Sequence, residues 1–119
     1  MMQNVGFQFA KGHAGSLSDL LQWADGRLLL LVFGALKRTQ IQKLALLSMG
    51  TPVRIVQVVH KTRGDALEHI VDKGKQLRKA CGAHGNGWAL LRSDAYLAAR
   101  GQQIDSKLVN AIAQSLALH

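Results

Sequence analysis

The run LLLLVF, Leu28–Phe33, decides the fold of this chain. Six uninterrupted apolar residues are far fewer than the roughly 20 that cross a bilayer as a helix. They fit a β-strand buried on both faces, because a strand with helices above and below it has no solvent side on which polar residues would alternate. We therefore take this run as the central strand and interpret the flanking segments outward from it.

The composition is that of one packed domain. The chain has 119 residues, 48% of them hydrophobic, and a single proline. A chain of this length can bury about two-thirds of its unfolded surface. The one cysteine, Cys81, excludes an internal disulfide and favours a reducing compartment. Residues 1–16 carry no apolar signal-peptide core, so we expect a cytoplasmic protein that does not enter membranes.

The spacing of apolar residues changes after the central strand. Beyond Gly34 the apolar residues recur at helical spacing, and the helix ends at Gly50, before Pro52. Its inward face is expected to hold Leu36, Ile41, Leu44, Ala45 and Leu47. Val53–Val59 (VRIVQVV) is β-branched almost throughout, which predicts a second strand. The helical connection makes this strand parallel to the first.

The second half of the chain shows a helix, a hairpin and a closing helix. Apolar residues step by three and four over residues 65–81, where Asp65 is placed to cap the helix and Gly82 to end it. A hairpin of Trp88–Leu91 and Tyr96–Ala99 follows the loop GAHGNG, and Gly101 is expected to break its second strand. The last helix, capped by Asp105 or Ser106, would bury Leu108, Val109, Ile112, Ala113 and Leu116.

The N-terminal segment adds little regular structure in this interpretation. Residues 1–15 lack periodicity and predict an irregular arm, and Ser16–Trp23 predicts one short helical turn with Leu17, Leu20 and Leu21 inward. Residues 16–119 then form a single domain. The predicted order is β-α-β-α-β-β-α, an α/β thioredoxin-like arrangement whose four-stranded mixed sheet has helices on both faces.

Thiol chemistry is the first function that such a fold suggests. A thioredoxin carries its reactive cysteine pair just after the central strand, at a helix N-terminus, where this chain has Gly34–Thr39 without sulfur. Dithiol exchange within the chain is therefore excluded. Cys81 falls on the apolar side at the end of the predicted helix 65–81, where the helix dipole would raise the pKa of its thiol. This position favours a buried structural residue, with a redox or peroxidatic thiol as the alternative.

Other candidate sites have weaker patterns. Cys81 and His84 form a C-x-x-H pair, but a structural zinc needs four ligands and no second pair exists, while His13, His60 and His69 are isolated. The glycines of GAHGNG lie between a helix and a strand, the reverse of a dinucleotide-binding loop. Trp23 and Trp88 are typical packing residues. The net charge of +8 is scattered, which favours a solvated basic surface over nucleic-acid binding.

The hairpin carries a family resemblance. Its sequence WALLRSDAYLAAR resembles the LVRPDGYVAWR-type signature that ends class A FAD-dependent aromatic-ring monooxygenases, such as the phenol hydroxylase and 3-(3-hydroxyphenyl)propionate hydroxylase-like enzymes. LSDLL, DGRLLLLVFG, PVRIVQVV and LRKACGA are similar in order to the same C-terminal domain, so the resemblance covers residues 16–118. The matching signature residues are Arg92, Asp94, Tyr96 and Arg100.

The resemblance implies a thioredoxin-like module that is redox-inactive and packs beside flavin and substrate domains. FAD is then expected only in the missing domain of a full-length relative, and no catalytic, cofactor or metal-binding residue is assigned to this chain. Our leading hypothesis is therefore a non-catalytic module that forms a homodimer or docks to a flavoprotein, which leaves open whether the chain is an enzyme. The alternatives are a single-cysteine thiol redox protein that uses Cys81, and a basic anion or nucleic-acid binder.

Overall fold

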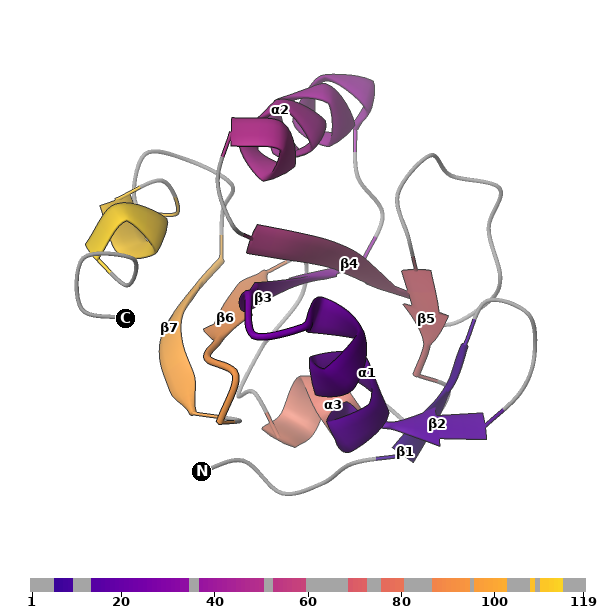
Figure 1. Ribbon diagram of the computed structural model, residues 1–119. Coiled ribbons are helices and arrows are strands. Elements are labelled where there is room, and N and C mark those ends of the chain that lie inside the picture. Colours follow the sequence, from indigo (N-terminus) through magenta and orange to yellow (C-terminus); the bar gives the residue numbers. More distant parts are fainter. Residues whose placement is uncertain are drawn as a thin grey trace.

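The central strand lies where the sequence predicts it. In the computed structural model, Leu28–Phe33 forms β3, and all six of its side chains are buried at 0% exposure. The structure describes residues 6–9, 14–34, 37–50, 53–59, 69–72, 76–80, 87–94, 96–102, 108 and 110–114. In this part of the chain a seven-stranded sheet runs in the order β2-β1-β5-β4-β3-β6-β7 (Figure 1).

The sheet is mixed, with both parallel and antiparallel strand pairs. The elements around β3 are β1 Gly6–Phe9, β2 Ala14–Ser16, α1 Leu17–Ala24, α2 Arg38–Gly50, β4 Val53–Val59, β5 His69–Val71, α3 Gln76–Ala80, β6 Trp88–Leu91 and β7 Leu97–Gly101. β3 pairs with β4 in parallel and with β6 in antiparallel orientation. Leu108 and residues 110–114 are helical as well. The thioredoxin-like α/β class is confirmed, whereas the expected four-stranded sheet is too small.

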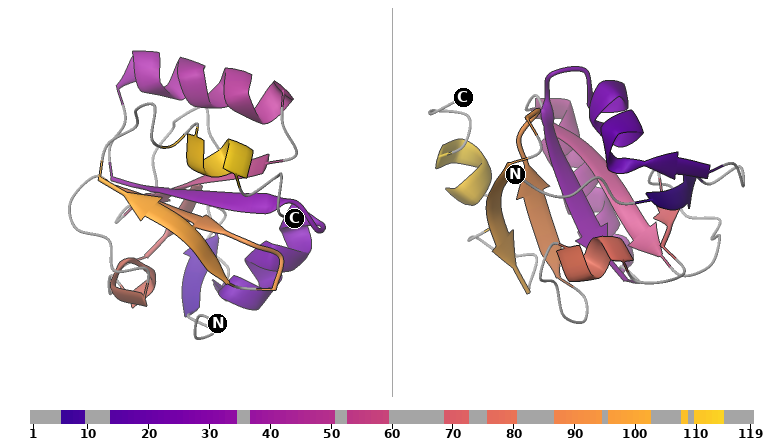
Figure 2. Two further views of the ribbon diagram at one scale, coloured as in Figure 1. Left: turned by 90° about the vertical axis from the view of Figure 1, so that its left-hand side faces the viewer. Right: turned by 90° about the horizontal axis from the view of Figure 1, so that it is seen from below.

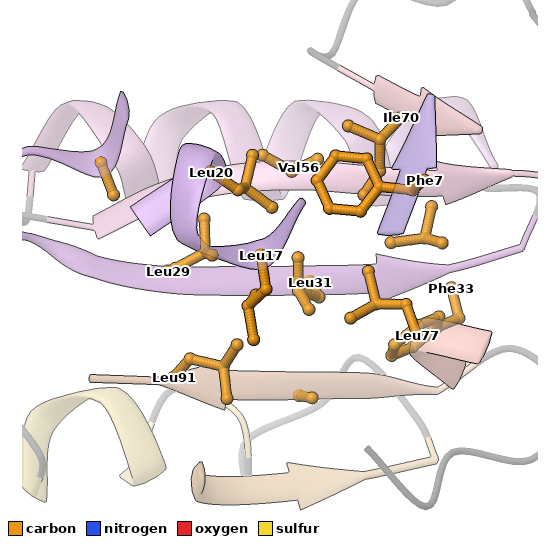
Figure 3. Close-up of a cluster of buried hydrophobic side chains, with 13 residues drawn as sticks. Phe7, Leu17, Leu20, Leu29, Leu31, Phe33, Val56, Ile70, Leu77 and Leu91 are labelled. Atoms are coloured by element: carbon orange, nitrogen blue, oxygen red, sulfur yellow. The ribbon is translucent and has the colours of Figure 1, made fainter. Parts of the chain in front are cut away.

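Helices cover both faces of the sheet, and two apolar clusters fill the layers between. Alternate residues of β3 point to opposite faces, so Leu29, Leu31 and Phe33 enter one cluster while Leu28, Leu30 and Val32 enter the other. The α1-side core contains Phe7, Leu17, Leu20, Ala24, Leu29, Leu31, Phe33, Val56, Val58, Ile70, Leu77, Ala89 and Leu91 (Figure 3). The α2-side core contains Leu28, Leu30, Val32, Leu44, Val53, Ile55, Trp88, Leu90, Leu108 and Ile112.

The short helix α1 is confirmed and has a capped start. The Ser16 backbone N–H donates to Asp19 Oδ2 at 2.9 Å, so a first-turn carboxylate satisfies a backbone donor at the helix N-terminus. Leu17 and Leu20 are buried, as their spacing predicts. Asp25 ends the helix in the left-handed region at a φ of 55°, and the turn then delivers the chain into β3.

The predicted helix over residues 65–81 is wrong in its first half. His69–Val71 forms strand β5, which lies between β4 and β1 with Ile70 opposite Val58. Short apolar runs fit a strand or a helix equally, and here the open edge of β4 supplies hydrogen-bond partners that a strand can use. Only Gln76–Ala80 is helical among the described residues of this segment. Asp65 and Gly82 lie outside them.

Residues 6–9 and 14–16 also depart from the sequence interpretation. They form β1 and β2, an antiparallel pair that extends the sheet beyond β5, where an irregular arm was expected. Phe7 of β1 packs into the α1-side core. The strands are only four and three residues long, too short to show a period in the sequence.

The C-terminal hairpin is confirmed with one correction at Gly101. This residue does not break the strand but ends β7 opposite Trp88. A Cβ atom at this position would lie 2.7 Å from three atoms of the Trp88 ring, so the close approach of the indole requires a glycine. Leu108 and Ile112 are buried as predicted, whereas the prediction for Ala113 is wrong because this residue is exposed. Asp105, Ser106, Val109 and Leu116 lie outside the described residues.

In the part of the chain that the structure describes, no helix has the length and apolar character needed to span a membrane.

Candidate functional site

The carboxyl end of β3 is the position at which a thioredoxin-like fold holds its chemistry. The Phe33 backbone N–H donates to the Gly87 carbonyl at 2.8 Å, and the Gly34 N–H donates to the Val58 carbonyl at 3.0 Å. The end of the central strand is thus held from both sides. Gly34 has a φ of 90°, which turns the chain out of the sheet towards α2.

The start of α2 brings positive charge to this edge. Lys37, Arg38 and Thr39 are exposed, and the first turn of the helix contains no acidic residue. The Lys37 backbone N–H donates to Gln40 Oε1 at 2.9 Å, which caps the helix. Ala35 and Leu36 lie outside the described residues. A helix N-terminus flanked by cations favours negative charge, although this turn supplies no sulfur nucleophile.

Gln57 of β4 reaches the same edge from within the sheet. Its side chain is 0% exposed, and its Nε2 donates to the Gly34 carbonyl at 2.9 Å. Its Oε1 is buried without a hydrogen-bond partner among the described residues. Sequence reasoning recorded Gln57 only as an interruption of an apolar strand. A polar residue in a strand buried on both faces is the signal that could have drawn attention to it.

The short helix α3 packs against the end of β3. Leu77 is 0% exposed and lies beside Phe33 in the α1-side core (Figure 3). Its backbone N–H donates to Asp72 Oδ2 at 3.1 Å, and the Asp72 N–H donates to the Val59 carbonyl at 2.8 Å. Asp72 therefore ties the first turn of α3 to the end of β4. Sequence analysis missed this role because it placed Asp72 inside a longer helix.

This capping contact predicts a measurable stability loss. Asp72→Ala removes the buried carboxylate that accepts the Leu77 N–H, so we expect the free energy of unfolding to fall by about 1–2 kcal/mol. Asp72→Asn keeps one acceptor oxygen of similar shape and serves as the control, with a smaller loss. Urea unfolding followed by circular dichroism compares the two. Equal losses would show that the acceptor for Leu77 is not what stabilises this turn.

Cys81 follows directly after Ala80, the last residue of α3, and itself lies outside the described residues. The expectation that a long helix dipole acts on its thiol is wrong, because α3 has five residues and the segment before it contains β5. A macrodipole is the sum over aligned peptide units, and little more than one turn supplies only a small part of it. The main electrostatic reason for assigning Cys81 a purely structural role is therefore lost.

The signature residues of the hairpin form a local turn. Arg92 Nη2 lies 3.1 Å from Asp94 Oδ2, and the Arg92 guanidinium carbon lies 5.7 Å from the centre of the Tyr96 ring. The Tyr96 N–H donates to Asp94 Oδ1 at 3.2 Å, which closes the turn. Arg100 is separate, since it lies on β7 opposite Ala89. These contacts explain three of the four residues as hairpin-forming groups.

The described residues contain no group of three or more His, Cys, Asp or Glu side chains that could hold a metal ion. The C-x-x-H pair of Cys81 and His84 lies outside them, as do His13 and His60. Only the backbone of His69 is described, in β5.

Comparison with known proteins supports the fold and changes the functional expectation. No family model and no curated protein sequence matches the chain. Among solved structures, it is similar to peroxidoxin BcpB from Mycobacterium tuberculosis with a TM-score of 0.73, at 13% identity over 99% of this chain and 95% of that one. It is also similar to dsbF of MTB, with a TM-score of 0.62 at 16% identity over 92% and 93%.

A third similar structure is the bacterioferritin comigratory protein of Xanthomonas campestris, which has alkyl peroxide reduction activity. Its TM-score is 0.64, at 14% identity over 97% of this chain and 91% of that one. At these identities the likeness establishes the thioredoxin-like fold.

The expected membership in the hydroxylase family is wrong. The similar structures include peroxiredoxins and thiol-disulfide oxidoreductases, whereas the expected match was the C-terminal domain of FAD-dependent hydroxylases. The leading hypothesis of a non-catalytic hydroxylase module is corrected with it, as is the description of the fold as redox-inactive. Hairpin residues misled the interpretation because Arg92, Asp94 and Tyr96 also serve the turn itself.

Proposed function

We propose that this chain is a thiol redox protein that uses Cys81 as its one sulfur nucleophile and a hydroperoxide as its oxidant. The observation that carries the proposal is a fold shared over nearly the whole chain with peroxiredoxins and thiol-disulfide oxidoreductases, together with the presence of a single cysteine. Of the activities of these similar proteins, peroxide reduction is the one that a single thiol can begin alone.

The number of cysteines selects the reaction. A chain with one thiol cannot form or exchange an internal disulfide, so it needs an external reductant. The Cys81 thiolate would attack the distal oxygen of a hydroperoxide, break the O–O bond and become a sulfenic acid, while the leaving alkoxide takes a proton. An external thiol would then form a mixed disulfide and release water. A second external thiol would free the Cys81 thiol and leave as the disulfide.

The described residues that flank Cys81 in the sequence lie near the end of β3. Leu77, four residues earlier, packs with Phe33 in the α1-side core. Gly87, six residues later, accepts the hydrogen bond from the Phe33 N–H. Lys79 is exposed on α3, and Lys37 and Arg38 are exposed at the start of α2. A cation beside the Cys81 thiol would favour its thiolate form. We place the protein in the cytoplasm, where reducing thiols are abundant.

Cys81→Ser tests the proposal directly. We expect the wild-type chain to consume an alkyl hydroperoxide in the presence of a small dithiol, and the serine variant to lose at least about 99% of that rate because the thiolate is the nucleophile. Mass spectrometry should detect one added oxygen on Cys81 after a single addition of peroxide.

The urea-unfolded wild-type chain supplies the intrinsic rate of an unassisted thiol. If the folded protein reacts no faster than the unfolded one, or if Cys81→Ser keeps its activity, the proposal is refuted. The rate of alkylation against pH gives a second measurement, since an activated thiol reacts near neutral pH and an ordinary one only at higher pH.

A further inference from the structure

The opposite edge of the sheet gathers arginines and exposed aromatic rings. Arg54 is the second residue of β4 and lies opposite Leu29, and Arg27 immediately precedes β3. Arg92 follows Leu91, which also pairs with Leu29. In the right-hand view of Figure 2 the turn between α1 and β3 lies at the same edge as the turn between β6 and β7. We call this side of the sheet, where β3 and β4 begin, the amino edge. It is remote from Gly34, which follows the other end of β3, and it does not take part in the proposed thiol chemistry.

Arg54 is the key residue of this edge. It is half-buried, and its guanidinium carbon lies 4.7 Å from the centre of the Trp23 ring. Its Nε is buried without a hydrogen-bond partner in the part of the chain that the structure describes. A buried donor without an acceptor is costly. The two terminal nitrogens of a guanidinium also carry N–H donors, and these suit carboxylate and phosphate oxygens.

Arg27 supplies a second cation at the same edge of the sheet. Its backbone N–H donates to the Ala24 carbonyl at 3.1 Å, which holds it next to the end of α1 that carries Trp23. Its side chain is exposed. Arg92 is different, because Asp94 neutralises part of its charge. Arg27 and Arg54 therefore supply the charge for an oxyanion at this edge.

Trp23 indicates what the oxyanion is attached to. The ring lies against the Arg54 guanidinium, yet the residue remains 37% exposed, so part of it is accessible to a ligand. Nucleobases stack on such rings, and the guanidinium beneath strengthens the platform. We propose that the amino edge binds a nucleotide, with its phosphate on Arg54 and Arg27 and its base on Trp23. Free nucleotides and single-stranded nucleic acid both carry this chemistry.

The test is calorimetric titration of the whole chain at about 0.15 M salt, which suppresses non-specific attraction by the net positive charge. The probes are adenosine monophosphate, inorganic phosphate and a short single-stranded oligothymidylate. We expect the nucleotide to bind several times more tightly than phosphate, and Arg54→Gln to weaken its binding at least about tenfold. A stronger response to the oligothymidylate would identify single-stranded nucleic acid as the source, and a stronger response to the free nucleotide a small-molecule ligand.

Three further variants make the result specific. Lys43→Gln, on the exposed side of α2, removes the same unit of charge and should change the affinity less than about twofold. Arg54→Lys keeps the charge and the aliphatic stem but loses the planar set of guanidinium donors, so binding should still weaken if Arg54→Gln folds poorly. Trp23→Leu should remove the preference for the nucleotide over phosphate. Equal losses in Arg54→Gln and Lys43→Gln, or equal affinities for nucleotide and phosphate in the wild type, overturn the proposal.

Discussion

Leu31→Ala is expected to destabilise the protein by about 3–4 kcal/mol, the range typical of a leucine deleted from a packed core. Leu31 is 0% exposed and lies in the middle of β3, with Val56 and Ala89 opposite it on the neighbouring strands. The substitution removes apolar contacts with the α1-side core and leaves a cavity that an interior strand cannot close by moving. Domains have about 5–15 kcal/mol of total stability, so the midpoint of urea unfolding should fall steeply.

Leu46→Ala provides the matched control for this change. Leu46 lies on α2 and is 70% exposed, so the same truncation removes little buried area. Its effect should stay within about 0.5 kcal/mol. Urea unfolding of both variants, with the slope against denaturant unchanged, measures the difference. Similar losses for the two leucines would mean that β3 is not the packed centre described above.

Gly87→Ala should have the second large effect, because it places an atom where the backbone already is. A Cβ at Gly87 would lie 2.6 Å from the Gly101 carbonyl oxygen, too close for any real contact. Gly87 also accepts the Phe33 N–H at 2.8 Å, so its displacement would loosen the end of β3. We expect a loss of about 1–3 kcal/mol, as for other overpacked interior sites, and faster amide hydrogen exchange at Phe33.

Gly6→Ala separates this clash from the general effect of adding a methyl group. Its Cβ would lie 3.8 Å from the Gly15 carbonyl oxygen, an ordinary contact, and Gly6 is exposed. The free energy of unfolding should change by less than about 0.5 kcal/mol. Alanine lowers the conformational entropy of the unfolded chain, and this offsets part of any loss of stability in the folded state. Chemical unfolding and exchange rates at Phe33 are compared in both variants. A Gly87→Ala protein as stable as Gly6→Ala would contradict the close packing of β6 and β7.

The candidate site was accessible to sequence reasoning only in part. Cys81 stands out as the one cysteine, and Gly34 marks the end of the central strand. The contribution of Gln57 depends on its reach to the Gly34 carbonyl from the neighbouring strand, and that of Asp72 on the shortness of α3. Such contacts join residues that are far apart in the chain or lie within turns, so the periodic pattern of apolar residues does not predict them.

The contact between Arg54 and Trp23 could not be predicted from the sequence either. Both residues are visible in the sequence, but the stacking exists only because β4 and the end of α1 meet at one edge of the sheet. Likewise, the hairpin residues Arg92, Asp94 and Tyr96 resemble a family signature, although their contacts serve the turn. Resemblance in a turn is weak evidence of descent, because turn geometry itself favours particular residues.

The sequence by itself determined the centre of this protein. Six apolar residues of β3, the β-branched run of β4, the glycine-bounded α2 and the hairpin all carry strong local patterns, and each lies where those patterns predict. Tertiary structure decided the rest of the sheet. His69–Val71 and the strands β1 and β2 are too short to prefer a strand on their own. The unpaired backbone groups at the edge of β4 form hydrogen bonds with β5, and the free edge of β5 then pairs with β1.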